Sequence, residues 1–277
     1  MSQGFVRSPA VAGTFYPENP EALRRQIATF LAEPPISEAS PPGRLKALIV
    51  PHAGYVYSGP IAAQAYRLLL PLRGQIKRVV LLGPAHRVYV PTVASSGASH
   101  FATPLGRVAV DEEFQGRAAP GLLVESRRAH QPEHSLEVQL PFLQEVLGPP
   151  APKIVPLLVS DAEPERVATV LSSLWGGPET LVVISSDLSH FLPYAQARRF
   201  DADTAQRILS FRTDLDGEQA CGCAAVNGLL RLASLRGLRS QLLDLRSSGD
   251  TAGGRDEVVG YAAFALYEAI ASETPTS

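Results

Sequence analysis

The stretch Lys46-Ala-Leu-Ile-Val-Pro-His52-Ala-Gly-Tyr-Val-Tyr-Ser-Gly59 decides the fold of this chain. Its apolar run from residue 47 to residue 50 has no polar alternation, which is typical of a strand covered on both faces in a mostly parallel sheet. Pro51 and Gly54 then prevent the strand from continuing. His52 is therefore expected just beyond the carboxyl end of a buried strand.

The same arrangement occurs at two further places in the chain. They are Arg78-Val-Val-Leu-Leu-Gly-Pro-Ala-His86 and Thr180-Leu-Val-Val-Ile-Ser-Ser-Asp187-Leu-Ser-His190. In open α/β sheets, ligands bind outside the carboxyl ends of the strands. The three strand endings therefore predict one shared site, with His52 and His86 within a few ångströms of each other and His190 nearby.

Helical and strand patterns alternate along the rest of the chain, which predicts right-handed parallel crossovers and an α/β fold. Residues 34–43 read as a loop and residues 272–277 as a frayed tail. Between residues 90 and 111 we expect irregular strands that partly cover the site. Helices are expected at 20–33, at 61–70 after Pro60, at 133–147 with a bend at Pro141, at 163–174, at 194–211 and at 216–234 with Asp216 as the N-cap, and further strands at 153–159, 240–245 and 258–266.

Composition and charge exclude several classes of protein. With 45% hydrophobic residues, 19% charged residues and a formal net charge of -2, the chain resembles a globular protein and neither a disordered nor a membrane-embedded one. No basic surplus indicates a nucleic-acid partner. The sequence shows neither the apolar leader that would indicate secretion nor an apolar run long enough to span a bilayer. We therefore expect a cytoplasmic protein with no membrane partner.

Four of the six histidines have neighbours that are typical of a functional site. His52, His86, His134 and His190 stand beside glycine, proline or acidic residues. A single histidine after a strand can simply bond a loop carbonyl. Several imidazoles close together cannot all satisfy one another, so a shared metal ion or a proton relay is the economical interpretation.

Cys221 is a further candidate ligand. It would lie within the first two turns of a helix that starts at Asp216, where exposed backbone N–H groups lower the pKa of a thiol. A buried, inert thiol is an equally good interpretation of the spacing. Cys223 is expected to point away, because two residues along a helix differ by about 200° of rotation. His100 and His130 have less distinctive settings and are expected at the surface or in support of the site.

Seven motifs follow one another from residue 8 to about residue 267. They are Ser8-Pro-Ala-Val-Ala-Gly-Thr-Phe-Tyr-Pro17, Pro51-His-Ala-Gly-Tyr-Val-Tyr57-Ser-Gly59, Leu82-Gly-Pro-Ala-His86, Glu133-His134-Ser-Leu-Glu137, Ser185-Ser-Asp187-Leu-Ser-His190, Cys221-Gly222 and Val259-Gly-Tyr-Ala262. Together they resemble the Memo family. That family includes the eukaryotic cell-motility mediator Memo and the bacterial component B of the AmmeMemoRadiSam system, and its fold is similar to that of class III extradiol ring-cleaving dioxygenases.

The resemblance implies one domain over residues 1–277 with a three-layer α/β/α fold, a mostly parallel central sheet and a mononuclear iron site. In the family pattern, His52, His86 and Cys221 match the metal ligands. Asp187 and His190 match residues that line the pocket, where we expect His190 to act as a general acid or base and Asp187 to orient it. Further residues expected in the pocket or in support of the ligands are Tyr57, Glu133 and His134.

The chain differs from the dioxygenases at the third ligand, where those enzymes have a carboxylate and this chain has Cys221. A thiolate keeps the negative charge but is softer, so Fe(II) is the expected cofactor with Cu or Zn as alternatives, and ring cleavage is no longer the expected reaction. The leading hypothesis is a metal-dependent oxidoreductase that acts on a small molecule. A protein that binds metal or peptide for signalling without chemistry is the alternative, and metal-assisted hydrolysis is a weaker one. The resemblance also implies a functional link to other AmmeMemoRadiSam components.

Overall fold

Four parallel strands form the centre of the main sheet in the computed structural model, which describes residues 4–36, 43–118 and 120–269. Their order in the sheet is β2-β9-β3-β8, and Leu48, Val80 and Ile184 on them are fully buried because both faces of the sheet are covered. The buried strands predicted from the sequence are thereby confirmed. They are β2 (Arg44–Val50), β9 (Thr180–Ser185), β3 (Arg78–Pro84) and β8 (Lys153–Val159).

Antiparallel strands extend this sheet at both edges. Beyond β2 lies β12, which pairs antiparallel with β2, β10 and β11. Beyond β8 lies β4, which is antiparallel to β8 and pairs in parallel with β7. Among the residues that the structure describes, this sheet has nine strands, and β1, β5 and β6 form a separate small sheet. The bounds are β12 (Val258–Glu268), β10 (His190–Leu192), β11 (Arg239–Ser247), β4 (Val93–Ser95), β7 (Leu123–Glu125), β1 (Val6–Arg7), β5 (His100–Thr103) and β6 (Gly106–Ala109).

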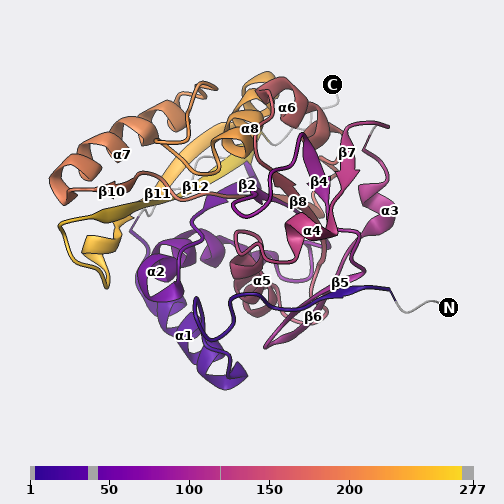
Figure 1. Ribbon diagram of the computed structural model, residues 1–277, viewed down its shortest axis with the longest axis horizontal. Helices are drawn as coiled ribbons and strands as arrows, with labels where there is room; N and C mark the ends of the chain where they lie inside the picture. Colours follow the sequence, from indigo (N-terminus) through magenta and orange to yellow (C-terminus); the bar gives the residue numbers. More distant parts are fainter. Residues whose placement is uncertain (1–3, 37–42, 119, 270–277) are drawn as a thin grey trace, which may run out of the picture.

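Helices cover both faces of the main sheet (Figure 1). Leu48 and Val50 belong to the core under α1, α2 and α5, whereas Ala47 and Ile49 belong to the core under α6, α7 and α8. The sheet therefore separates two hydrophobic cores, which confirms the expected three-layer α/β/α architecture. The bounds are α1 (Pro20–Ala32), α2 (Tyr55–Tyr66), α5 (Leu140–Leu147), α6 (Pro164–Ser173), α7 (Tyr194–Leu209) and α8 (Cys223–Leu235), with shorter segments α3 (Glu112–Gln115), α4 (Arg127–His130), η1 (Arg67–Leu72), η2 (Glu137–Gln139) and η3 (Ser248–Asp250).

Three helices begin at other residues than the sequence pattern predicted. α2 begins at Tyr55 and contains Pro60, because the carbonyl of Gly54 already accepts the first N–H bonds of the helix. α5 begins at Leu140, so Pro141 occupies its first turn, where a missing N–H costs nothing, and it does not bend a longer helix. The third case is α8, which is described with the candidate metal centre.

A buried ion pair fixes the segment that precedes α1. The guanidinium of Arg7 bonds the carboxylate of Glu137, and its Nε donates to the carbonyl of His130 at 3.1 Å. The hydroxyl of Tyr16 donates to the same carboxylate at 2.5 Å. The first motif of the chain is thus held against η2, directly behind the site.

His130 is buried and does not lie at the surface. Its Nε2 donates to the carbonyl of Ala94 at 3.0 Å, while its Nδ1 has no partner among the described residues. Burial lowers the pKa of His130 to about 4. His100, on β5, is partly exposed and lies beside the hydroxyl of Ser99.

Two sequence predictions fall wholly or partly outside the described residues, namely the tail at 272–277 and most of the loop at 34–43. Within the described part of the chain, none of the helices combines the length and the apolar character that crossing a bilayer requires.

Candidate metal centre

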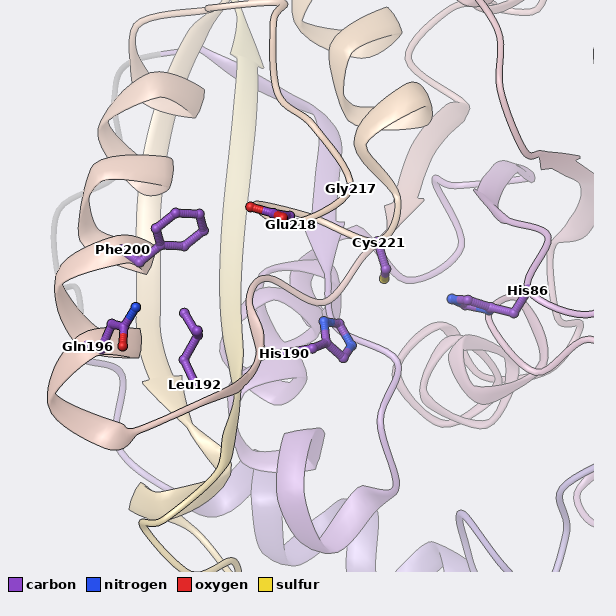
Figure 2. A pocket seen from close by; sticks show the side chains of 8 residues that line it. All are labelled: His86, His190, Leu192, Gln196, Phe200, Gly217, Glu218 and Cys221. Carbon is purple, nitrogen blue, oxygen red and sulfur yellow. The ribbon is translucent and has the colours of Figure 1, made fainter.

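The loops that follow β2, β3 and β9 meet at the carboxyl edge of the sheet, as the strand endings predicted. The ring centroids of His52 and His86 lie 5.2 Å apart. His190 lines a cavity together with His86 and Cys221, and the side chains of the latter two face each other across it (Figure 2). Residues from three separate strand endings therefore share one site.

His134 joins the first two histidines in a compact cluster. One ring nitrogen each of His52, His86 and His134 lies within 4.8 Å of the others. His134 stacks on His86 with an interplanar angle of 17° and meets His52 edge-on at 86°. Metal–nitrogen bonds of about 2.0–2.1 Å would suit donors at this spacing, so the histidines could hold a metal ion.

Hydrogen bonds hold the Nδ1 atoms of His52 and His86, and a carboxylate lies near that of His134. His52 Nδ1 lies 2.8 Å from Ser185 Oγ, and Glu133 Oε1 lies 2.9 Å from His86 Nδ1 and 3.3 Å from His134 Nδ1. The rings of His52 and His86 are thereby oriented, and their Nε2 atoms are left for the cluster. Such outer partners are typical of histidines that bind metals.

Glu133 is the hub of these contacts. It is buried, and its carboxylate also accepts the backbone N–H groups of His86, His134 and Ser135 at 2.6–2.9 Å. Burial alone would raise its pKa, but these bonds and the His86 imidazole lower the pKa of Glu133 to about 2. The carboxylate is therefore charged at neutral pH.

The imidazoles of His52 and His134 are neutral at neutral pH. Burial, reinforced by the neighbouring imidazoles, holds the pKa of His52 well below its usual range, and burial lowers that of His134 to about 4. The neutral imidazole is the form that binds metals. His52 and His134 are thus in the protonation state in which an imidazole could bind a metal ion.

Cys221 lies beside this cluster but not in a helix. Asp216 accepts the N–H groups of Glu218 and Gln219 at 3.0 Å, which closes a turn, and α8 begins only at Cys223 with Gly222 as its N-cap. The Sγ of Cys221 lies 3.3 Å from His52 Nε2.

The expected lowering of the Cys221 pKa is wrong for the metal-free protein. Burial and the nearby Asp187 raise it. The N–H of Asp187 donates to Sγ at 3.3 Å. Cys223 packs against the core under α8 and is outside the site.

Comparison with known proteins shows the family of this chain. The family model described as Memo-like protein matches residues 7–265. The chain belongs to the Memo family. A MEMO1 family protein of Ignicoccus hospitalis is 37% identical over 93% of this chain and 97% of its own length, and one of Sulfolobus acidocaldarius is 35% identical over 92% and 97%.

Similarity in structure shows the fold alone. The crystal structure of the uncharacterized protein JW3007 from Escherichia coli K12 matches 80% of this Memo-family chain and 99% of its own, with a TM-score of 0.51 and 12% identical residues. The α/β class inferred from the sequence is thus found in a solved structure as well.

No hydrogen bond joins Asp187 to His190 among the described residues, so the orienting role of Asp187 stays a prediction. Its Oδ1 accepts the backbone N–H of His52 at 2.7 Å, and burial raises its pKa to about 7. His190 bonds the backbone of Leu188 instead, and burial lowers its pKa. His190 sits on β10 at an irregularity of the pairing with β12, where Phe191 has a positive φ of 59°.

Two cavities meet at His190 in this Memo-family chain. One has a volume of about 560 Å³ and the other about 540 Å³. None of the described residues between 90 and 111 lines either of them, so the expected cover from that segment is wrong. The first is lined by His86, His190, Leu192, Gln196, Phe200, Gly217, Glu218 and Cys221, and the second by Thr14, Phe15, Ala53, Gly54, Tyr57, His134, Asp187, His190, Ser248, Gly253, Gly254, Glu257, Val259 and Tyr261.

Sequence reasoning missed two of the residues at this site. Ser185 holds the His52 ring, and Tyr261 lines the second cavity. Both lie inside motifs of the family pattern, which was the only signal available for them in the sequence. Neither has a distinctive local setting, because one ends a buried strand and the other lies within one.

Proposed function

We propose that this Memo-family protein is a metal-dependent oxidoreductase that acts on a small molecule and uses Fe(II) held by His52, His86 and Cys221. The observation that carries the proposal is the convergence of three imidazoles beside a buried thiol at the carboxyl edge of the sheet. A cation there would compensate the thiolate, which burial alone disfavours. Cu and Zn are the alternatives that such a donor set also accepts.

The neighbourhood of the thiol supports its assignment as the third ligand. The contact of 3.3 Å to His52 Nε2 is of the size expected between two donors that share one ion, and the Asp187 N–H favours a thiolate. His134 faces the same point as a further donor. Fe(II) held there would supply redox and Lewis-acid chemistry.

His190 is the residue best placed to move a proton. It lines both cavities, and the lowered pKa leaves its imidazole neutral near pH 7, able to accept a proton from a ligand hydroxyl. Asp187 acts indirectly, because it fixes the backbone of His52 and contacts Cys221.

A metal-dependent peptide-binding protein without chemistry is the second candidate. The mouth of the site favours it, because the side chain of Phe191 beside His190 is 69% exposed and that of Tyr57 is 39% exposed. Exposed aromatic side chains of this kind are common anchors for protein partners. O₂ uptake by anaerobically Fe(II)-loaded protein in the presence of catechols separates the two candidates.

The ligand assignment is tested by titrating Fe(II) under nitrogen into the parent protein, Cys221→Ser and Cys223→Ser. Loss of a direct ligand should weaken binding by at least about 100-fold, since even outer partners are worth 10–100-fold. Cys223→Ser should retain the affinity of the parent. His134→Ala should weaken binding less than Cys221→Ser.

Two results would contradict the assignment. Equal losses in both serine variants, or none in either, would make the cysteines core residues. A large loss in His134→Ala with none in Cys221→Ser would assign the ion to the three histidines.

A further inference from the structure

The second cavity combines carboxylates with aromatic rings. Among the described residues that line it are Asp187 and Glu257, together with the rings of Phe15, Tyr57 and Tyr261. No lysine or arginine of the described chain lines this cavity or the first one, to which Glu218 adds another carboxylate. An anionic ligand would therefore be desolvated near Glu257 with no cationic side chain of the described residues to offset the cost.

Tyr261 points to a polar group on the ligand. Val259 and Tyr261 alternate along β12 and both line the cavity, whereas a side chain at Gly260 would run into Asp201 on the other face. Tyr261 is only 1% exposed as a residue and lines the cavity, and its hydroxyl makes no hydrogen bond with the described residues. A tyrosine hydroxyl can both donate and accept, so it can bond a polar group of a ligand in this cavity.

Glu257 lines the cavity and takes part in no ion pair among the described residues. Arg255, two positions earlier, lies over the ring of Tyr194, with its guanidinium carbon 4.5 Å from the centroid, and donates to the carbonyl of Gly249. An exposed carboxylate by itself carries little meaning, but here it stands at one end of a cavity that also contains an unpaired hydroxyl and three rings.

We propose that the second cavity binds the protonated primary amine of a small organic ligand. The ammonium would donate to Glu257 and to the hydroxyl of Tyr261, and the rings of Phe15 and Tyr57 would provide cation–π contact. The inference rests on the proposed function only in directing the other end of the ligand toward His134 and the metal centre. It adds the charge of the ligand, which the family resemblance does not supply.

Three phenols of similar size but different charge test the proposal. They are tyramine, with an ammonium, 4-ethylphenol, which is neutral, and 4-hydroxyphenylacetate, with a carboxylate. Calorimetry with the metal-free protein and with the Zn(II)-loaded protein gives the three Kd values in each form. We expect tyramine to bind about 10-fold tighter than 4-ethylphenol, since a charged hydrogen bond is worth about that much, and 4-hydroxyphenylacetate to bind most weakly.

Matched variants locate the preference. Glu257→Gln should bring the Kd of tyramine close to that of 4-ethylphenol and leave the Kd of 4-ethylphenol unchanged. Asp256→Asn removes the same charge from an exposed neighbour that does not line the cavity, and it should keep the preference. Tyr261→Phe should weaken tyramine binding and spare 4-ethylphenol.

The proposal would be overturned if the three phenols bound equally, if the carboxylate bound best, or if Asp256→Asn removed the preference as completely as Glu257→Gln. Failure of the proposed function gives a different pattern. If Fe(II) fails to bind while the preference for tyramine persists in the metal-free protein, the amine site stands without the oxidoreductase. If Fe(II) binds as proposed and the preference is absent, only the amine site is wrong.

Discussion

Glu133 connects the chemistry of the site to the backbone that builds it. One carboxylate bonds the Nδ1 atom of His86, lies near that of His134 and accepts three backbone N–H groups of the same loops. A negative charge so close to two imidazoles makes their Nε2 atoms more basic and fixes the direction in which they point. A metal ion held by these imidazoles would therefore depend on Glu133 without touching it.

Glu133→Gln should weaken metal binding by about 10–100-fold, because an amide N–H₂ would face donors that now bond a carboxylate oxygen. Leaving a buried N–H unsatisfied should also lower the free energy of unfolding by about 1–3 kcal/mol. Metal titration and urea unfolding measure the two effects. Glu218→Gln is the control, since it removes the same charge from the first cavity. If Glu133→Gln and Glu218→Gln had similar metal affinities, the negative charge near the cavity, and not the hydrogen bonds of Glu133, would set the affinity.

For single residues, the sequence predicts a position in the site when that position depends only on neighbours in the chain. His52 and His86 follow buried strands directly, so their meeting at the sheet edge could be inferred from the pattern alone. The partner of Asp187 could not, because it is the backbone of a residue 135 positions away. The prediction of a lowered pKa for Cys221 failed for a similar reason. The pKa of this thiol depends on a turn that Asp216 closes and on burial by another loop.

The turn before α8 positions Cys221 at the scale of an element. The N–H of Gly222 donates to Ser186 Oγ at 3.0 Å, and a Cβ on Gly222 would lie 2.7 Å from the carbonyl oxygen of Ser185. The two loops are thus in backbone contact. Helix starts of this kind are missed from the sequence, because the cap is made by a glycine backbone in tertiary contact and not by a polar side chain.

Gly222→Ala should push these loops apart, which costs about 1–3 kcal/mol of stability as overpacking does, and should weaken Fe(II) binding by displacing Cys221. Gly217→Ala is the matched control, because a Cβ there meets nothing within 4 Å in the same segment. Unfolding in urea and anaerobic titration provide the readouts. If the two variants behave alike, the close approach at Gly222 does not position the thiol.

For the whole molecule, buried neutral histidines make stability depend on pH. His130 has a pKa of about 4 in the folded protein, against about 6.5 in an unfolded chain. The unfolded state therefore binds a proton that the folded state does not, so the contribution of His130 is complete above about pH 6.5 and is lost as the pH falls toward 4. The lowered pKa values of His52, His134 and His190 act in the same direction.

His130→Asn should flatten this dependence in the metal-free protein. Between about pH 7 and pH 4.5 the parent should lose about 2 kcal/mol more of its free energy of unfolding than the variant does. Urea unfolding at both values of pH measures the difference. Equal losses would show that the folded protein protonates His130 as readily as the unfolded chain.

The sequence pattern predicts some features of the whole fold and misses others. The α/β class and the parallel centre follow from unbroken apolar runs such as Leu181–Ile184, which need cover on both faces. The antiparallel edges could not be predicted, because strand direction at an edge depends on chain crossings that no local pattern records. The separate small sheet of β1, β5 and β6 has the same origin, since it joins residues 6–7 to a hairpin more than 90 positions later.

The contact between His52 and Cys221 joins distant parts of the chain. The two residues are 169 positions apart, so an ion shared by them would crosslink more than half of the chain into one closed loop. Crosslinks of that span restrict the unfolded ensemble by an entropy worth at most about 5 kcal/mol. Loading with metal would then slow unfolding and hinder proteolysis, and the lifetime of the protein itself would report the supply of its metal.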